Sequence, residues 1–592
     1  MQKYVEIIEN AIRELFDANS SENFNVKISR TDAKFGDYST NIAMILAGKL
    51  KRNPREIAEE ITKKLRESSE FESVEIAGAG FINLKISAKN LAENLNKQFI
   101  QARENKRNFG ENNDGWIYEI DEKSGEKIRE KQKVAIVEYP SPNMAKPYSV
   151  GHLRSGNQGW AARNLLKASG WKVITDNHLG DSGSPFGFWV LGFKKFSNEE
   201  KLAKNGIYEL GRVYIKIREE LKKEEARGEK TLANEAQSWL LKLENQDPEA
   251  MKLSEKFNKI SLDHIHEIMN RLGISTDYEI GEKFYVESGK SEVQKLLKEN
   301  IATKNSDGSV IIDLTDEGIE TPILVLKSNG AALYATTDLA TMIYREENWH
   351  PEKVVYCVGS EQKFYFEQLA ALAKKIGVKS ELYHLWFGTI DQINEDGTRA
   401  KMSSRKGVVL MEELLNAALE KARENAKSDE MSEEDLRKIS VGAIKFTDFA
   451  SDRRTSMLFD WENMFSLTGF SGPYVQYAAV RINKILKDNS EENSENPNAE
   501  NYDFANEKDL ILKMLEYPEI LRVAARELEP HRIANYIYEL ARELNRYYEK
   551  TPIATAEVSP EIKKIRLNFL RKIAAIFEHS LGILGIEIPD KM

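Results

Sequence analysis

An apolar, strand-like run that leads directly into the start of a helix is the feature that most constrains this chain. Residues 134–137 (VAIV) are apolar, and residues 141–155 (SPNMAKPYSVGHLRS) follow them. In a sheet covered by helices, such a turn can bind phosphate, because the amides at a helix start are unpaired donors and the helix dipole attracts an anion. Four residues of the turn could admit an anion or donate to it: Lys146, Ser149, Gly151 and His152. Turns with Gly and Pro are often ordinary connections, so this segment alone leaves both interpretations open.

A second segment, residues 401–407 (KMSSRKG), favours the phosphate interpretation. We predict a flexible basic loop there, between residues 386–388 (WFG) and a helical run over 411–426. Lysine and arginine side chains beside two hydroxyls can stabilise the charge that develops on a triphosphate as pyrophosphate leaves. A solvated turn is the alternative interpretation.

Together the two segments resemble the nucleotide-binding motifs of class I aminoacyl-tRNA synthetases, His-x-Gly-His and Lys-Met-Ser-Lys-Ser. Within that class, the run SPNMAKP followed by GHLRS is similar to the arginyl-tRNA synthetase family. Six further segments stand in the order of that family: residues 35–41 (FGDYSTN), 78–83 (GAGFIN), 177–183 (NHLGDSG), 333–338 (LYATTD), 359–362 (GSEQ) and 472–477 (GPYVQY). The resemblance therefore covers nearly the whole chain.

Three positions depart from the family pattern. Ser149 stands where the first histidine of the motif is usual, and Tyr365 stands where a histidine usually follows the segment around Gln362. Ser404 stands where the basic loop usually has its second lysine, a role that Lys406 could take. Serine can donate one hydrogen bond but cannot carry charge or reach as far as histidine. We expect these departures to affect the rate of the reaction and not its identity.

The resemblance implies ATP-dependent ligation of L-arginine to tRNA(Arg). The arginine carboxylate would attack the α-phosphate of ATP to form arginyl-adenylate, and the 3'-terminal adenosine of the tRNA would then take the arginyl group. This family generally needs bound tRNA before it activates the amino acid. Because no covalent enzyme intermediate is needed, catalysis is positioning plus electrostatics. The catalytic residues would be His152, Lys401, Ser403 and Lys406, and the ATP-binding residues would be Lys146, Ser149, Gly151, His152, Lys401, Met402 and Ser403.

The arginine site can be argued from acidic residues. A guanidinium has five donors and stays protonated, so a selective pocket needs at least one buried carboxylate. Tyr334 and Asp338 share one face if residues 333–344 form a helix, although an exposed pair on a helix surface is the alternative. By resemblance, Glu138, Tyr334 and Asp338 surround the guanidinium, while Asn143 and Gln362 hold the α-amino and carboxylate groups. We interpret His178 as a structural group in a turn.

Composition limits the other functions of the chain. A single cysteine, Cys357, excludes a disulfide framework and a thiolate metal cluster, and we expect it to be buried and inert. His264 and His266 are two residues apart and cannot converge on a metal from a helix, so no zinc is expected, and Mg²⁺ is expected only with ATP. No prosthetic group is expected. No run approaches ~20 apolar residues and the N-terminus has no apolar signal region, which predicts a cytoplasmic protein with no membrane partner. We also expect a monomer.

The net charge of -10 argues weakly against nucleic acid, because phosphate contacts need lysine and arginine. The tRNA assignment therefore depends on the resemblance. By that resemblance, the helical C-terminal region reads the anticodon, and its contacts would include Tyr474, Tyr477, Arg481 and Met592. Aromatic residues at helical spacing that face a core are the alternative interpretation.

We predict a multidomain α/β fold. An α+β, tRNA-contacting domain is expected over residues 1–105 and a polar linker over 106–133. A Rossmann-like catalytic domain is expected over 134–410, with a helical insertion at about 199–272, and a helical connector and all-α anticodon-binding bundle over 411–592. The second half of the nucleotide fold is expected to contain strands at 309–314, 322–326, 354–358 and 384–388.

Two other functions stay open. A lysyl- or cysteinyl-tRNA synthetase is disfavoured by the acid pair Glu138 and Asp338 and by the lack of a set of zinc-binding cysteines. A non-catalytic tRNA-binding paralogue is conceivable from Ser149 and Tyr365, but His152, Lys401 and Ser403 argue against it. Exchange of pyrophosphate with ATP, measured with arginine or lysine and with or without tRNA, would separate these possibilities.

Overall fold

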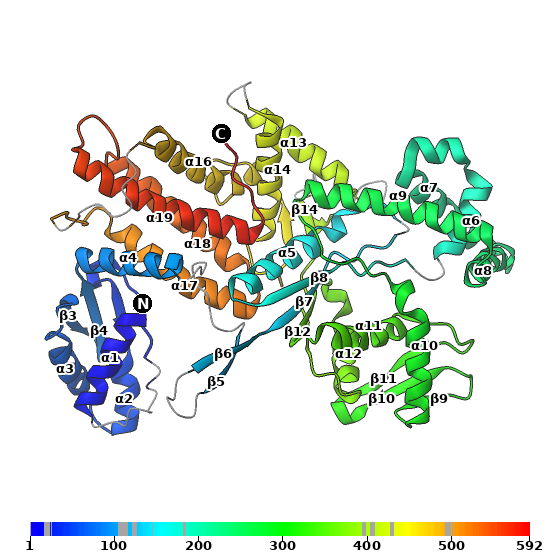
Figure 1. Cartoon of the computed structure of the whole chain (residues 1–592), viewed down its shortest axis with the longest axis horizontal. Helices are drawn as coiled ribbons and strands as arrows, with labels where there is room; N and C mark the ends of the chain where they lie inside the picture. Colours follow the sequence, from blue (N-terminus) through cyan, green and yellow to red (C-terminus); the bar gives the residue numbers. More distant parts are fainter. Residues whose placement is uncertain are drawn as a thin grey trace. The chain divides into compact units, whose positions relative to one another are not determined.

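The computed structural model forms two compact units (Figure 1), each assembled from separated segments of the chain. Unit 1 comprises Met1–Gly110, Arg481–Leu521 and Tyr536–His579, and unit 2 comprises Glu111–Val480, Arg522–Asn535 and Ser580–Met592. The structure describes residues 2–16, 24, 26–104, 116–120, 127–144, 146–181, 185–393, 398–402, 409–426, 431–491, 499 and 501–592. No helix within these ranges is long and apolar enough to cross a membrane.

Unit 1 begins with an antiparallel sheet in the order β1-β2-β4-β3, accompanied by helices. These elements are α1 (Gln2–Leu15), β1 (Ser29–Arg30), β2 (Tyr38–Thr40), α2 (Ile42–Leu50), α3 (Pro54–Leu65), β3 (Phe71–Ala77), β4 (Phe81–Ile86) and α4 (Ala88–Glu104). Helix α3 shows how the sequence sets a boundary, because Pro54 occupies its first turn and the Asn53 side chain accepts the Arg55 amide at 2.9 Å. The predicted α+β character of this region is confirmed.

The C-terminal helices are α16 (Gly472–Asp488), α17 (Lys508–Glu527), α18 (His531–Lys550) and α19 (Pro560–Leu584). Parts of all four belong to unit 1, where they pack against its N-terminal segment. Lys572 donates to Asn96 at 2.6 Å, and the Lys508 ammonium lies 2.9 Å from the Asp37 carboxylate. The predicted helical character of the C-terminal region is confirmed, and unit 1 combines the N-terminal segment with parts of these helices.

Unit 2 is centred on a parallel sheet in the order β13-β12-β7-β8. Its elements are β7 (Val134–Glu138), α5 (Leu153–Ala168), β8 (Lys172–Asp176), α11 (Tyr334–Trp349), β12 (Lys353–Tyr356), α12 (Lys363–Lys375) and β13 (Glu381–His384). Every residue of β7 is buried, as expected for a strand covered on both faces. Val137 packs in one cluster with Leu166, and Ile136 packs in another with Leu339. Helices therefore cover both faces of the sheet, and the carboxyl ends of its strands share one edge.

Two strands predicted for this sheet belong to another one. β10 (Val310–Leu314) and β11 (Ile319–Leu326) pair antiparallel with each other, and β10 also pairs with β9 (Ala302–Lys304). Their assignment to the parallel nucleotide fold was wrong. Only a 3-10 turn, Thr315–Glu317, and Gly318 with φ 85° separate β10 from β11, whereas a parallel crossover needs about a dozen residues or more.

The strand predicted at 384–388 is also displaced, because β13 ends at His384. Arg453 draws the following residues out of the sheet: it donates to the Trp386 carbonyl at 2.6 Å, and its own carbonyl accepts the Gly388 amide at 2.9 Å. The chain then enters a small sheet that the sequence did not predict, in the order β15-β14-β16. Its strands are β14 (Ile390–Ile393), β15 (Arg399–Lys401) and β16 (Met457–Phe459).

The remaining elements of unit 2 lie outside these sheets (Figure 1). A hairpin of β5 (Trp116–Ile120) and β6 (Lys127–Gln132) falls within the expected linker. The predicted insertion contains α7 (Glu199–Ala226), α8 (Thr231–Glu244) and α9 (Pro248–Arg271), and it is preceded by α6 (Pro185–Phe196), which was not predicted. The other helices are α10 (Glu282–Lys298), α13 (Met411–Asn425), α14 (Glu433–Asp448) and α15 (Trp461–Met464).

Candidate active site

A cavity of about 660 Å³ lies in unit 2 where β7 and β12 end. Its walls include all five residues predicted to bind arginine: Glu138, Asn143, Tyr334, Asp338 and Gln362. Three residues predicted to bind ATP also line it: Gly151, His152 and Met402. Segments that lie more than 200 residues apart in the sequence therefore meet in one site, at the edge of the sheet where an α/β fold places its ligands.

His152 ends the short 3-10 turn Val150–His152 that leads into α5. The amide of Ser149 donates to His152 Nδ1 at 3.4 Å, so the ring proton of the neutral imidazole sits on Nε2. Burial lowers the pKa of His152 to about 4, which keeps the ring uncharged near neutral pH. His152 is therefore a neutral hydrogen-bond donor at the start of a helix.

Ser149 contacts His152 and is not part of the cavity wall. Its hydroxyl lies 3.3 Å from His152 Nδ1, and it caps the turn that His152 ends. The serine that replaces the usual histidine of the motif thus orients the remaining histidine. A Cβ on the neighbouring Gly151 would meet only the Ser149 hydroxyl, at 3.3 Å, so this side of the turn is open to a ligand.

The segment that carries Asn143 is held by the segment that carries His178. The Met144 amide donates to the Gly180 carbonyl at 3.2 Å, and the Gly180 amide donates to the Pro142 carbonyl at 3.3 Å. A Cβ at position 180 would lie 2.5 Å from Asn143 Oδ1, so glycine is required there for Asn143 to keep its place. This close approach holds the two motifs together in one site.

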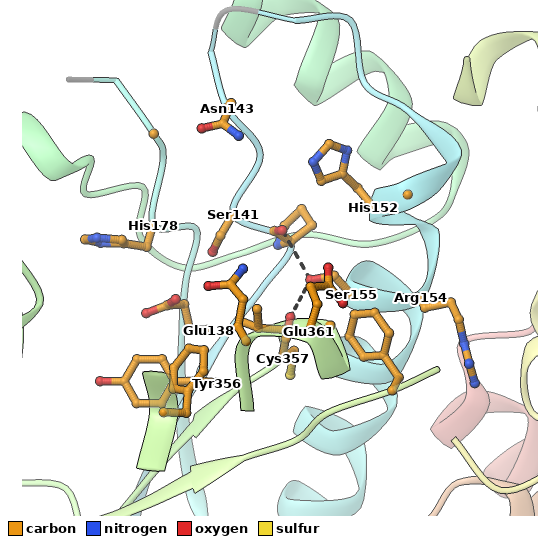
Figure 2. A pocket seen from close by; sticks show the side chains of 18 of the residues that line it. Glu138, Ser141, Asn143, His152, Arg154, Ser155, His178, Tyr356, Cys357 and Glu361 are labelled. Carbon is orange, nitrogen blue, oxygen red and sulfur yellow. Dashed lines mark hydrogen bonds between the residues drawn. The ribbon is translucent and has the colours of Figure 1, made fainter. Parts of the chain in front are cut away.

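Arg154 and Ser155 support the site through hydrogen bonds to other segments of unit 2. Figure 2 shows Arg154 directed away from the other labelled side chains, and it donates to Asp448 at 2.8 Å while fully buried. The Ser155 hydroxyl donates to the Cys357 carbonyl at 2.7 Å and lies 3.2 Å from the Pro140 carbonyl (Figure 2). The predicted burial of Cys357 is confirmed, and burial raises the pKa of its thiol far above the usual value.

A buried arginine organises the acidic end of the cavity, although no motif in the sequence indicated it. Arg345 Nη2 donates to Glu138 Oε2 and to Asp176 Oδ2, both at 2.7 Å. Burial opposes the charge of Arg345, but Glu138, Tyr356 and Asp176 hold its pKa well above the usual value. Glu138 is thus already paired within the protein through Oε2, and its predicted contact with a substrate guanidinium stays a prediction. The sequence feature that could have indicated this role is the position of Arg345, seven residues after Asp338 on the apolar face of α11.

Among the described residues, no cationic side chain is bonded to Asp338, which faces the cavity. Tyr334 and Asp338 lie on the same side of α11, as their spacing predicted, and both line the cavity. Burial raises the pKa of Asp338, whereas His178 and a hydrogen bond donated by Tyr365 lower it. Arg345 pairs with the carboxylates of Glu138 and Asp176, and Asp338 is a third carboxylate that its charge influences. Three carboxylic acids beside one guanidinium suit a cationic ligand.

His178 lines the cavity, although its position in a turn suggested a structural role. It is 9% exposed, and its ring centroid lies 5.6 Å from that of Tyr285. Among the described residues, neither ring nitrogen of His178 has a hydrogen-bond partner. Its nitrogens are available to a ligand, which no pattern in the sequence indicated.

The other predicted phosphate contacts are distributed differently. Lys146 is exposed, and its ammonium lies 5.9 Å from the centre of the Tyr214 ring. Lys401 is the last residue of β15 and pairs with Asp391 of β14, and the Met402 amide donates to the Ile390 carbonyl at 2.7 Å. Ser403 and Lys406 lie outside the described residues. The structure thus places the start of the basic segment at the cavity and leaves the role of its later residues as a prediction.

Comparison with known proteins identifies the family. Residues 117–461 match the family described as tRNA synthetases class I (R), catalytic domain; residues 475–592 match the DALR anticodon binding domain; and residues 2–86 match the arginyl tRNA synthetase N terminal domain. The arginine–tRNA ligase of Clostridioides difficile is 32% identical over 607 aligned positions that cover 100% of both chains. That of Streptococcus agalactiae is 34% identical over 561 positions that cover 93% of each chain. The chain belongs to the arginyl-tRNA synthetase family.

Solved structures support the fold of this arginyl-tRNA synthetase family member. The Thermus thermophilus arginyl-tRNA synthetase superposes with a TM-score of 0.78 at 22% identity, and 100% of both chains is covered. The Plasmodium falciparum enzyme gives a TM-score of 0.74 at 24% identity, with 100% of this chain and 99% of the other covered. The predicted fold class is confirmed by these structures. Family membership confirms the predicted activity, which is charging of tRNA(Arg) with arginine for translation, and the class implies use of ATP.

The predicted RNA contacts of this synthetase fall on α16 and at the chain end. Tyr477 is 40% exposed and, with Met592, lines a small cavity of about 130 Å³ in unit 2. Tyr474 is half-buried on the same helix. In unit 1, the Arg481 guanidinium lies 4.3 Å from the centre of the Tyr548 ring. The exposure of Tyr477 disfavours the interpretation of that residue as a core aromatic.

The described part of the chain has no group of three or more His, Cys, Asp and Glu side chains that could hold a metal ion. His264 and His266 have separate partners: His264 Nε2 accepts the Tyr148 amide at 3.3 Å, and His266 lies 2.7 Å from Glu279. Mg²⁺ as the partner of ATP stays a prediction for this arginyl-tRNA synthetase, since a triphosphate supplies its own oxygen ligands.

Proposed function

We propose that the cavity of unit 2 is where this chain activates arginine with ATP, to form arginyl-adenylate and pyrophosphate. The observation that carries the proposal is the contrast within one cavity between an acidic group and a neutral histidine at a helix start. The acidic group suits a guanidinium, and the helix start suits phosphate. Arginine and ATP together present both chemistries.

At the acidic end, Asp338 accepts the guanidinium of the substrate. Glu138 acts through Arg345 to which it is bonded, and it adds negative charge without needing to touch the ligand. Tyr334 is 65% exposed on the turn of α11 before Asp338, so its ring can cover the bound side chain. Asn143 and Gln362 supply neutral polar groups for the α-amino and carboxylate groups, because both line the same cavity.

At the other end, the amides of the turn at residues 150–152 and the Nε2 proton of His152 bind the phosphates. A neutral donor stabilises the charge that develops on the α-phosphate while costing no reorganisation at the moment of reaction. Lys401, Ser403 and Lys406 of the basic segment stabilise the departing pyrophosphate in this proposal. Mg²⁺ bound to the triphosphate would supply further charge neutralisation there.

The second step takes the arginyl group to the 3'-terminal adenosine of tRNA(Arg), and AMP leaves. The anticodon end of the tRNA contacts α16 through Tyr474 and Tyr477. Arg481 follows them in the same helix, and Met592 lines the same small cavity as Tyr477. Stacking of single-stranded bases on exposed aromatic rings supports this role for Tyr477. We further propose that the enzyme acts as a monomer in the cytoplasm.

The test is exchange of labelled pyrophosphate into ATP by the full chain. We expect exchange with arginine in the presence of tRNA(Arg), and none with lysine. Exchange with lysine at a similar rate would contradict the assignment of the acidic end. Binding of tRNA(Arg) without exchange or aminoacylation would mean that the chain is a non-catalytic paralogue.

A further inference from the structure

Tyr365 connects α12 to the acidic end of the cavity. Its hydroxyl donates to Asp338 Oδ2 on α11, and both side chains line the cavity. The ring packs edge-on against Phe366, with 5.6 Å between the centroids, which limits its freedom. Among the described residues, Tyr365 is the one hydrogen-bond donor to Asp338.

Charged and titratable groups approach Asp338 from every element packed around it. The groups near Asp338 are Glu138 at the end of β7, His178 after β8, Tyr334 and Arg345 on α11, and Tyr365 on α12. Glu282 at the start of α10 and Tyr356 at the end of β12 lie beside Tyr365. Burial and Asp338 raise the pKa of Tyr365 well above its usual value. The phenol therefore stays protonated in any ordinary assay and remains a donor.

A donor that is always protonated has two effects on Asp338. It fixes the plane of the carboxylate by occupying Oδ2, so that Oδ1 is presented to a ligand in one orientation. It also stabilises the ionised form, which burial and Glu138 disfavour. Unlike a histidine at this position, tyrosine brings no positive charge of its own. The residue at position 365 therefore adds no positive charge that would offset the carboxylates at this end of the cavity.

We propose that Tyr365 is a positioning residue that orients Asp338 for the guanidinium of arginine and strengthens the preference of the site for arginine over its uncharged isostere, citrulline. This inference rests on the proposed function. It predicts that Tyr365 acts on binding of the amino acid and not on the chemistry of the phosphate, because the Tyr365 hydroxyl bonds to the carboxylate proposed to hold the arginine side chain.

The test compares Tyr365→Phe with the unaltered enzyme in ATP–pyrophosphate exchange at saturating ATP and tRNA(Arg). We expect the KM for arginine to rise roughly ten-fold, as for loss of a hydrogen bond to a charged group, while kcat stays within about three-fold. The advantage of arginine over citrulline as a competitor should fall by a similar factor. Loss of the donor raises the pKa of Asp338, so the increase in KM should grow as the pH is lowered.

Two further variants make the test specific. Tyr344→Phe removes a hydroxyl from α11 at a ring that packs against Phe284 and Tyr285 outside the cavity, and it should leave KM unchanged. Tyr365→His keeps a donor and should recover part of the affinity. Melting temperatures of all variants show whether each protein is folded.

Several outcomes would overturn the inference. One is an unchanged KM in a folded Tyr365→Phe variant, and another is a loss confined to kcat. A rise in KM that does not depend on pH, or an equal rise in Tyr344→Phe, would also reject it. If the unaltered enzyme shows no arginine-dependent exchange at all, the proposed function fails instead, so the two failures are distinguishable.

Discussion

The two ends of the cavity are built in different ways. At the acidic end, side chains from β7, β8, α11 and α12 bind one another before any ligand arrives, through Arg345 and Tyr365. At the phosphate end, the described groups are a helix start and one neutral histidine, and the further residues expected there come from the basic segment after β15. The first end is organised by the fold itself, so changes there should affect stability and affinity. Changes at the second end should affect the rate.

The largest expected effect is on stability. Arg345→Met would leave the buried carboxylates of Glu138 and Asp176 without their cation, and we expect the free energy of unfolding to fall by about 3–5 kcal/mol. Chemical denaturation of the full chain measures this. The matched control is Arg423→Met, whose ion pairs are exposed, and it should barely change the free energy of unfolding. Equal effects in both variants would remove the distinction between the acidic end and an ordinary surface.

Asp338→Ala should weaken arginine binding by about 2–5 kcal/mol, because the guanidinium loses a buried charge partner. Isothermal titration with arginine in the presence of tRNA(Arg) measures this, and ATP affinity should hardly change. Asp338→Asn keeps the volume of the side chain and should show a loss of similar size if charge is the cause. Retained arginine affinity in either folded variant would show that another group binds the guanidinium.

His152→Ala tests the other end of the cavity. It should lower the rate of activation by on the order of 10²-fold while the KM for arginine stays within a few-fold, which is the pattern for a donor used in the transition state. Its melting temperature should be close to that of the unaltered enzyme. His266→Ala, at an exposed histidine paired with Glu279, should be neutral. A loss of arginine affinity equal to the loss of rate would mean that the two ends are not separable.

The smallest expected effect lies away from both ends. Tyr477→Ala should raise the KM for tRNA(Arg) roughly ten- to a hundred-fold, since loss of a stacked base costs about 1–3 kcal/mol. Arginine binding at saturating tRNA should not change, and Tyr477→Phe, which keeps the ring, should be nearly normal. A large fall in melting temperature without a selective effect on tRNA would instead identify Tyr477 as a packing residue.

The comparison also explains what the sequence could and could not predict. The spacing of Tyr334 and Asp338 predicts their common face, because both belong to one helix whose geometry is local. Arg345 was missed because its partners, Glu138 and Asp176, are 207 and 169 residues away, and only the pairing of β7 with β8 and the packing of α11 bring them together. Likewise, nothing local shows that Tyr365, on α12, meets Asp338.

The sequence predicted elements with a local pattern well, and it predicted the pairing of strands less well. Helix α13 (Met411–Asn425) nearly matches the helical run expected over 411–426, since helical spacing can be read from consecutive residues. β10 and β11 were recognised as strands but placed in the wrong sheet, although the short connection between them already required a hairpin. The prediction did not take into account how short the connection between β10 and β11 is.

The buried pairing of Arg154 with Asp448 has a consequence for any attempt to shorten this enzyme. Arg154 also donates to the Thr455 carbonyl at 2.8 Å, and its neighbours Asn157 and Gln158 donate to the same aspartate. A fragment that ended after the basic segment would retain residues 141–155 but would leave the buried guanidinium of Arg154 without its counter-ion. The smallest autonomous catalytic piece must therefore extend at least to residue 455.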